Sequence, residues 1–114
     1  MKFKNPLLTT GCLILALAGA GSVHAAVDAA QAQELMESNK CTKCHSIEKT
    51  KTGPSLKCVA AKYKGKAEGE DNSIKTITTG RKVKLADGTE EDHKIIKTQD
   101  AAKLKNLAQW VLSL

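Results

Sequence analysis

Two cysteines and a histidine form a cluster whose residue types and spacing could do chemistry. They stand in the stretch Cys41-Thr42-Lys43-Cys44-His45, where two residues separate the cysteines and the histidine follows directly. A Cys-x-x-Cys pair can ligate zinc, act as a redox-active thiol pair, or hold haem through two thioethers. With histidine next in the chain, the pattern matches covalent haem attachment.

The two competing uses of the cysteine pair find less support. A tetrahedral zinc site needs four ligands, and outside the motif residues 26–114 offer only Cys58 and His93 as further cysteines or histidines. Thioredoxin-like chemistry needs alternating strands and helices, which this sequence does not predict. For haem, the two-residue spacing lets both sulfurs reach the vinyl positions on one edge of the porphyrin, and the histidine is carried beneath the iron.

The start of the chain is typical of an export signal. Lys2 and Lys4 are followed by a mostly small and apolar stretch over residues 7–20, and Val23-His24-Ala25 suits signal peptidase. Export agrees with haem attachment, because c-type haem is attached outside the cytoplasm.

Two other interpretations of the first 25 residues are weaker. A lipoprotein cysteine should follow its apolar run, whereas the run continues after Cys12. A membrane anchor needs about 20 apolar residues, and this segment is shorter and interrupted. We therefore expect cleavage after Ala25, a periplasmic location, and a mature domain of residues 26–114 that does not span a membrane.

This domain is weakly basic and poor in aromatic residues. Loss of Lys2 and Lys4 lowers the net charge from +6 to +4, and Tyr63 and Trp110 are the aromatic residues that remain. Small domains commonly depend on disulfides, metals or cofactors for stability. A covalently bound porphyrin would supply the apolar bulk that the sequence lacks.

Helical patterns and capping signals indicate which elements position the motif. Residues 27–39 predict a helix that Asp28 caps, with Gln31 three residues later, and it leads directly into the cysteine motif. Short helices are expected at 59–64 and at 71–79, the second ended by Gly80. The Asp87-Gly88 pair predicts a small hairpin that joins residues 82–86 to 89–93.

The last helix has the clearest pattern. Thr98 is its predicted cap, and apolar residues follow on one face at spacings of three and four. These residues are Leu104, Leu107, Ala108, Val111 and Leu114, with Trp110 beside them.

From end to end, residues 26–114 resemble a small bacterial class I cytochrome c. The resemblance rests on a helix that runs into "CTKCH", on "GPSLKCVAAKYKGK", and on a final helix that ends in "LAQWVLSL". It implies an all-α fold of three to four short helices wrapped around one covalent haem c. The helices at the two chain ends should cross near the haem edge, with Leu35 and Met36 against Leu107, Trp110 and Val111.

The resemblance also implies roles for single residues. Cys41 and Cys44 would carry the thioethers, His45 would be the proximal iron ligand, and Trp110 would contribute to cofactor binding. The Pro54 carbonyl would accept a hydrogen bond from the other ring nitrogen of His45, which fixes the tautomer and raises the donor strength of the ligand.

One feature of the family is missing, because no methionine stands in the loop before the last helix. The two methionines are Met1 and Met36, and His93 lies near the position where the family's distal ligand falls. His93 is therefore the leading candidate for the sixth iron ligand. The alternatives are a surface histidine with an open or lysine-ligated iron, and ligation by Cys58 or Met36. A second imidazole would favour ferric iron and a lower potential than methionine gives.

Cys58 is a second departure, since the family commonly has a small residue there. We expect a small buried side chain at the start of a helix, and a dimer linked through Cys58 is the alternative.

These features favour an electron carrier rather than an enzyme. Export and the scarcity of aromatic side chains argue against a nucleic-acid partner. Redox proteins are expected to dock at a lysine-rich haem rim. The alternative is a haem sensor in which His93 leaves the iron on reduction and a small gas binds. The expected rim consists of Lys40, Lys43, Lys49, Lys51 and Lys57.

Overall fold

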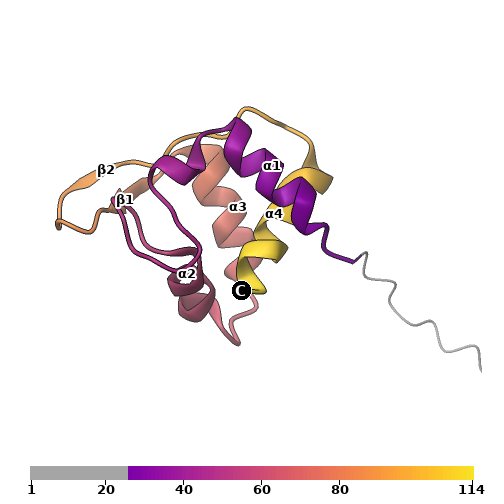
Figure 1. The fold of residues 1–114 in the computed structure, drawn as a ribbon, viewed down its shortest axis with the longest axis horizontal. Coiled ribbons are helices and arrows are strands. Elements are labelled where there is room, and N and C mark those ends of the chain that lie inside the picture. The colour runs from indigo at the N-terminus through magenta and orange to yellow at the C-terminus, as the bar shows by residue number, and fades with distance from the viewer. Residues whose placement is uncertain (1–25) are drawn as a thin grey trace, which may run out of the picture.

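A computed structural model describes residues 26–114, so the expectations for residues 1–25, including the signal segment and Cys12, lie outside the described residues. Four helices and a two-stranded hairpin make up the fold (Figure 1), and within residues 26–114 this confirms the predicted helical class with one small sheet added. In chain order the elements are α1 (Ala29–Ser38), a 3₁₀ turn (Cys41–Lys43), α2 (Leu56–Tyr63), α3 (Gly69–Thr79), β1 (Lys82–Lys84), β2 (Glu90–Asp92) and α4 (Ala101–Leu112).

The first and last helices pack against each other, as the sequence predicts. Asp28 caps α1 by accepting a hydrogen bond from the Gln31 backbone N–H at 2.9 Å. The Asn106 side chain of α4 exchanges two hydrogen bonds of 2.8 Å with the Asp28 backbone, which fixes the start of α1 on α4. Their contact forms the main part of the core, together with residues of α2 and of the loop before α4. The buried cluster contains Ala32, Met36, Leu56, Ile96, Leu104, Leu107 and Trp110, with Leu35 and Val111 packed against it.

Helix α4 starts later than predicted. Its N-cap is Asp100, whose carboxylate accepts from the backbone N–H groups of Ala102 at 3.0 Å and Lys103 at 3.3 Å. The prediction that Thr98 caps this helix is wrong. The Thr98 hydroxyl instead accepts a hydrogen bond from the backbone N–H of Asp100, the N-cap residue, at 3.2 Å.

The predictions for the two middle helices hold within a few residues. Helix α2 begins at Leu56 rather than at residue 59, because the Ser55 hydroxyl accepts from the Cys58 N–H at 3.1 Å and caps it. Helix α3 ends at Gly80, whose φ of 64° is left-handed. Such a conformation suits glycine at a helix C-terminus.

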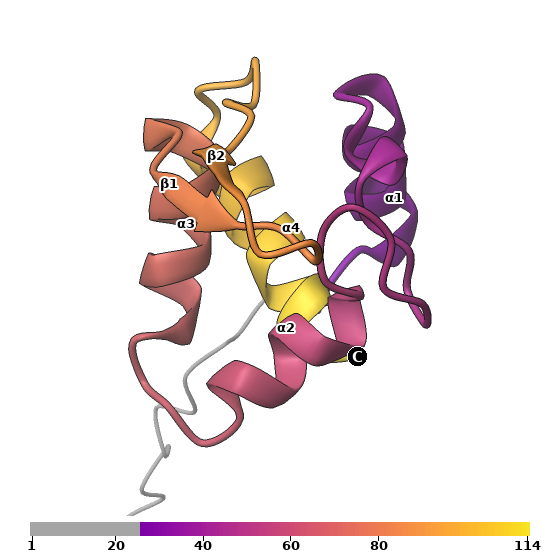
Figure 2. The same cartoon turned by 90° about the vertical axis from the view of Figure 1, so that its left-hand side faces the viewer.

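The hairpin is confirmed, with β1 and β2 antiparallel and Val83 opposite Glu91. In its turn, the Asp87 carboxylate accepts from the Thr89 N–H at 2.9 Å and from the Thr89 hydroxyl at 2.6 Å, which lowers the pKa of Asp87. The Ala86 N–H donates to the Thr52 carbonyl at 3.1 Å. The hairpin tip is thereby joined to the loop that precedes α2, and Figure 2 shows the hairpin in front of α3.

None of the helices found in residues 26–114 has both the length and the hydropathy that a membrane crossing requires.

Candidate haem site

A cavity of about 1040 Å³ lies between the cysteine motif, α2, α3 and the hairpin. Helix α3 faces it with a row of residues that includes Ser73, Thr76 and Ile77. Helix α3 packs on α4, but its only buried residue is Gly69, so its inner face is only partly covered by protein. The motif residues line the same space. They are Cys41, Cys44 and His45, joined by Met36, Pro54 and His93.

The ring of His45 is held by the loop that follows it. Its Nδ1 lies 2.7 Å from the Pro54 carbonyl oxygen, so Nδ1–H donates to that oxygen and Nε2 keeps its lone pair. Gly53 makes room for the ring, since a Cβ there would lie 3.0 Å from His45 Cε1. Burial lowers the pKa of His45, an effect that the Pro54 hydrogen bond opposes and the nearby His93 reinforces. A neutral imidazole is the form that binds a metal.

His93 faces His45 from the segment after β2. The two ring centroids are 6.0 Å apart and the ring planes differ by 32°. The Nδ1 of His93 lies 2.8 Å from the Lys94 carbonyl oxygen, to which it donates. Both histidines therefore use Nδ1 in a backbone hydrogen bond and leave Nε2 free.

This arrangement fits a haem between the two rings. Two imidazoles bound on opposite sides of one metal, with bonds of about 2.0 Å, have ring centres roughly 6 Å apart. The half-buried sulfurs of Cys41 and Cys44 border the same cavity, and burial raises the pKa of the Cys41 thiol.

A polar edge of the cavity also suits a haem, which carries two carboxylates. The Ser73 hydroxyl is buried and has no hydrogen-bond partner among the described residues. One helical turn later, Thr76 accepts from Arg81 Nε at 2.8 Å, and all three residues line the cavity. An unpaired buried hydroxyl and a guanidinium that line the same cavity are groups that would stabilise an anionic group there.

Trp110 and Cys58 differ in where they lie relative to the large cavity. Trp110 is 6% exposed and borders a smaller cavity, of about 150 Å³, together with His45. It is absent from the lining of the large cavity. The expectation that Cys58 is buried is wrong, because its side chain is exposed at the margin of the large cavity. The buried residues of α2 are Leu56 and Ala60, and Cys58, two residues from each, lies on the other side of the helix.

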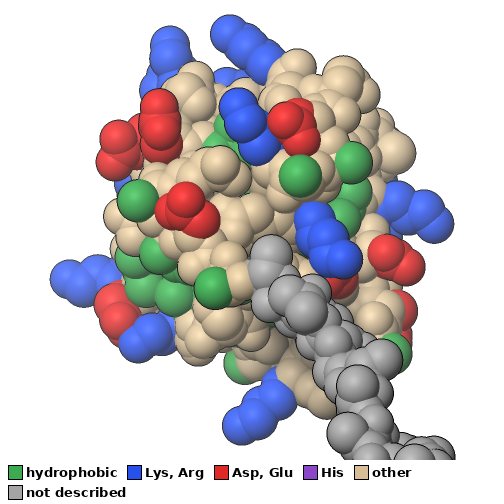
Figure 3. All heavy atoms as spheres, turned by 90° about the vertical axis from the view of Figure 1, so that its right-hand side faces the viewer, with side chains coloured by type: hydrophobic (Ala, Val, Ile, Leu, Met, Phe, Trp, Pro, Cys, Tyr) green, Lys and Arg blue, Asp and Glu red, His purple; other side chains and the backbone are tan. Residues whose placement is uncertain are grey.

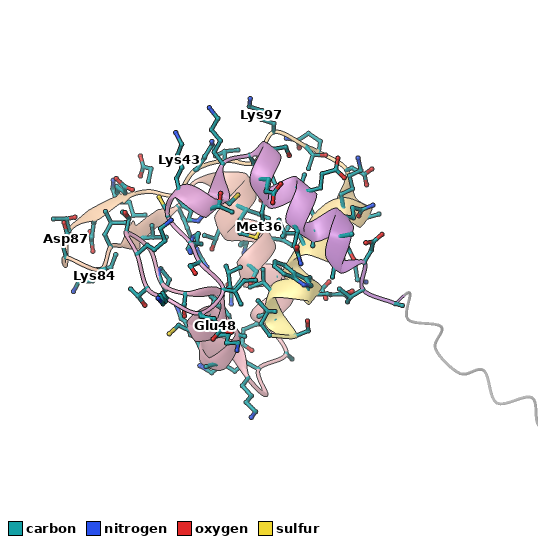
Figure 4. The ribbon with its side chains drawn as sticks, viewed as in Figure 1. Met36, Lys43, Glu48, Lys84, Asp87 and Lys97 are labelled. Carbon is teal, nitrogen blue, oxygen red and sulfur yellow. The ribbon has the colours of Figure 1, made fainter. Side chains whose placement is uncertain are left out.

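The five lysines expected at the haem rim differ in their surroundings. Lys57 pairs with Glu48 at 2.6 Å, and Lys51 donates to the Thr42 carbonyl at 2.8 Å. Lys40 lines the cavity, and Figure 4 shows Lys43 pointing away from the fold. Four further lysines line the cavity and were not expected at the rim. Lys62 lies on α2, Lys82 and Lys84 lie on β1, and Lys94 follows His93.

Comparison with known proteins gives one consistent result. The family model for cytochrome c matches residues 29–114. Cytochrome c-551 of Stutzerimonas stutzeri is 35% identical over 101 residues, which cover 89% of this chain and 92% of that protein. Cytochrome c-551 of Allochromatium vinosum is 32% identical over 80 residues, or 70% of this chain and 82% of the relative.

Solved structures agree with the sequence relatives. The class 1 cytochrome MtoD from Sideroxydans lithotrophicus ES-1 superimposes with a TM-score of 0.73 and 47% identity, and the match covers 77% of this chain and 97% of MtoD. Nitrosomonas europaea cytochrome c552 gives a TM-score of 0.59 and 29% identity, over 72% of this chain and 98% of that structure. The chain therefore belongs to the cytochrome c family, as a small class I electron-transfer protein with one covalently bound haem c.

Proposed function

We propose that this protein is a periplasmic electron carrier whose haem iron is bound by His45 and His93. In this proposal Cys41 and Cys44 form the thioethers. The observation that carries the ligation is the facing pair of histidines, with ring centroids 6.0 Å apart and both Nε2 atoms without a hydrogen-bond partner in residues 26–114. Membership of the cytochrome c family supports the general function, electron transfer by a haem protein.

The chain's own residues set the properties of the site. When bound, the haem supplies a reversible one-electron change at its iron. The carbonyls of Pro54 and Lys94 fix the tautomers of the two histidines and raise their donor strength. Two imidazoles stabilise ferric iron more than imidazole with thioether does, so the potential should lie below that of methionine-ligated relatives.

Lysines near the cavity would guide a redox partner with an acidic surface. Lys40, Lys84 and Lys94 line the cavity and have no ion pair among the described residues. On the face opposite the hairpin, basic and acidic side chains are interspersed (Figure 3), which makes that face a weaker docking site. Oxidation of the reduced protein by ferricyanide, an anionic acceptor, should slow as salt rises. A rate indifferent to salt would remove the steering role.

Replacement of His93 tests the ligation directly. The oxidised protein should show the low-spin electron paramagnetic resonance signal of two imidazoles, and His93→Ala should convert the iron to a high-spin form. Lys94→Ala is the matched control, because it keeps the backbone carbonyl that binds His93. A low-spin spectrum that His93→Ala leaves unchanged would exclude His93 as a ligand.

Carbon monoxide distinguishes the carrier from a gas-binding protein. A carrier with both axial positions filled should bind the gas slowly in its reduced form. Rapid binding by the unaltered protein would instead support the sensor, in which His93 leaves the iron on reduction.

A further inference from the structure

We infer that Asn39 is a positioning residue for the distal ligand, because its side chain fastens the segment that follows His93 to the end of α1. The inference rests on the proposed ligation by His93. It concerns how firmly that ligand is held rather than which residue it is.

Asn39 is a buried polar residue with its hydrogen bonds directed to two parts of the chain. It is 5% exposed and stands at the C-terminus of α1. Its Nδ2 donates to the Leu35 carbonyl at 2.9 Å, and its Oδ1 accepts from the Lys97 N–H at 3.0 Å. A flipped amide would set NH₂ against that N–H, so the two partners fix the orientation of the side chain.

Besides this bond, the segment from His93 to Lys97 is held by two backbone hydrogen bonds and by the side chain of Ile96, which is 4% exposed in the core. It starts with the His93 N–H donating to the Arg81 carbonyl at 3.0 Å, and later the Ile96 N–H donates to the Ile77 carbonyl at 2.8 Å. Between them Ile95 is 52% exposed. Figure 4 shows Lys97 near the end of α1 with its side chain directed outward, so that its backbone, not its side chain, makes the link.

Asn39 therefore connects the two segments that would approach the iron. It precedes Cys41 by two residues, and it binds the peptide four residues after His93. Three hydrogen bonds join the His93 segment to the rest of the described chain, and the bond from Asn39 is the one that a side chain makes. Without it, the Lys97 N–H loses its partner and the segment can move away from the iron more often.

The population with His93 off the iron can be measured through carbon monoxide, which binds reduced haem when the sixth position is open. The observed rate scales with that open fraction. Asn39→Ala should raise the rate roughly five- to 150-fold, the range expected for loss of one hydrogen bond that leaves a buried donor unpaired. Asn39→Asp keeps an acceptor for Lys97 and should stay closer to the original rate.

Asn106→Ala is the matched control. Asn106 also ties α1 to the C-terminal part of the chain, through the two hydrogen bonds with Asp28 at the opposite end of the helix. Its loss should lower the unfolding free energy while the rate of carbon monoxide binding stays unchanged. Amide exchange at Lys97 should accelerate in Asn39→Ala and not in Asn106→Ala.

The outcomes separate this inference from the proposed ligation. If Asn39→Ala and Asn106→Ala change the rate equally, Asn39 only stabilises the fold and the inference is wrong. In a His93→Ala background the Asn39 effect should vanish, because no distal ligand remains to be held. An effect that persists there also contradicts the inference, whereas an unchanged spectrum of His93→Ala alone contradicts the ligation.

Discussion

The position of His45 depends on a neighbour that has no side chain. A Cβ on Gly53 would lie 3.0 Å from His45 Cε1 and 3.3 Å from the Cys44 carbonyl oxygen, and the backbone atom cannot move aside. Overpacking of this kind costs about 1–3 kcal/mol. We therefore expect Gly53→Ala to lower the unfolding free energy of the haem-loaded protein by that amount in denaturant titrations.

The exposed neighbour Thr52 provides the control for this change. Thr52→Ala keeps the backbone carbonyl that binds Ala86 and should alter stability by less than about 0.5 kcal/mol. Equal stability of the two variants would show that the loop adapts to a side chain at residue 53.

At the residue scale, the sequence predicts contacts between residues that lie close together in the chain. The His45 to Pro54 hydrogen bond spans nine residues of one loop and was expected from the resemblance. The choice of His93 as the candidate second ligand follows from the lack of histidines other than His45 in residues 26–114. The role of Asn39 could not be read from sequence, because its partner lies 58 positions away, and the exposure of Cys58 depends on which face α2 turns outward.

Among the elements, the junction of α3 with the hairpin controls the position of His93. Gly80 ends α3 with φ of 64°, and a Cβ there would lie 2.9 Å from Ile95 Cγ1 and 3.0 Å from the His93 carbonyl oxygen. Gly88 in the hairpin turn has φ of 88° with no atom within 4 Å of such a Cβ. A side chain at either glycine would strain the backbone, but only one at residue 80 would also contact neighbouring atoms too closely.

Alanine at each glycine separates these effects. Gly88→Ala should cost about 1 kcal/mol for the left-handed conformation. Gly80→Ala should cost about 1–3 kcal/mol more, and it should perturb the low-spin spectrum because the clash displaces the His93 segment. Equal losses and an unperturbed spectrum would mean that Gly80 only ends the helix.

The element boundaries show where capping signals compete. The sequence predicts Thr98 as the N-cap of the last helix, and Asp100, two residues later, takes that place in the structure. In the structure the Lys97 N–H is bound by Asn39 and the Asp100 N–H by Thr98, so the helix begins only after Asp100. The hairpin and the end of α3 were predictable, because glycine at a left-handed position leaves little choice.

For the whole molecule, the distribution of buried residues explains why a cofactor is needed. The core cluster comes from α1, α2, α4 and Ile96, whereas α3 adds only the partly buried Ile77. A haem that fills the space of about 1040 Å³ would bury the apolar side chains that line it, which stabilises the fold.

Removal of the haem should therefore unfold the molecule unevenly. In the variant with Cys41→Ala and Cys44→Ala, purified without haem, we expect the amides of α3 to lose protection from hydrogen exchange first. The paired α1 and α4 should keep part of theirs, because they pack on each other through core residues such as Leu104 and Trp110, which do not line the cavity. Native-state exchange followed by mass spectrometry would measure both sets of amides in one sample. If α3 remained as protected without haem as with it, the cavity would have to close around protein atoms alone, and the cofactor would not be what holds α3 in place.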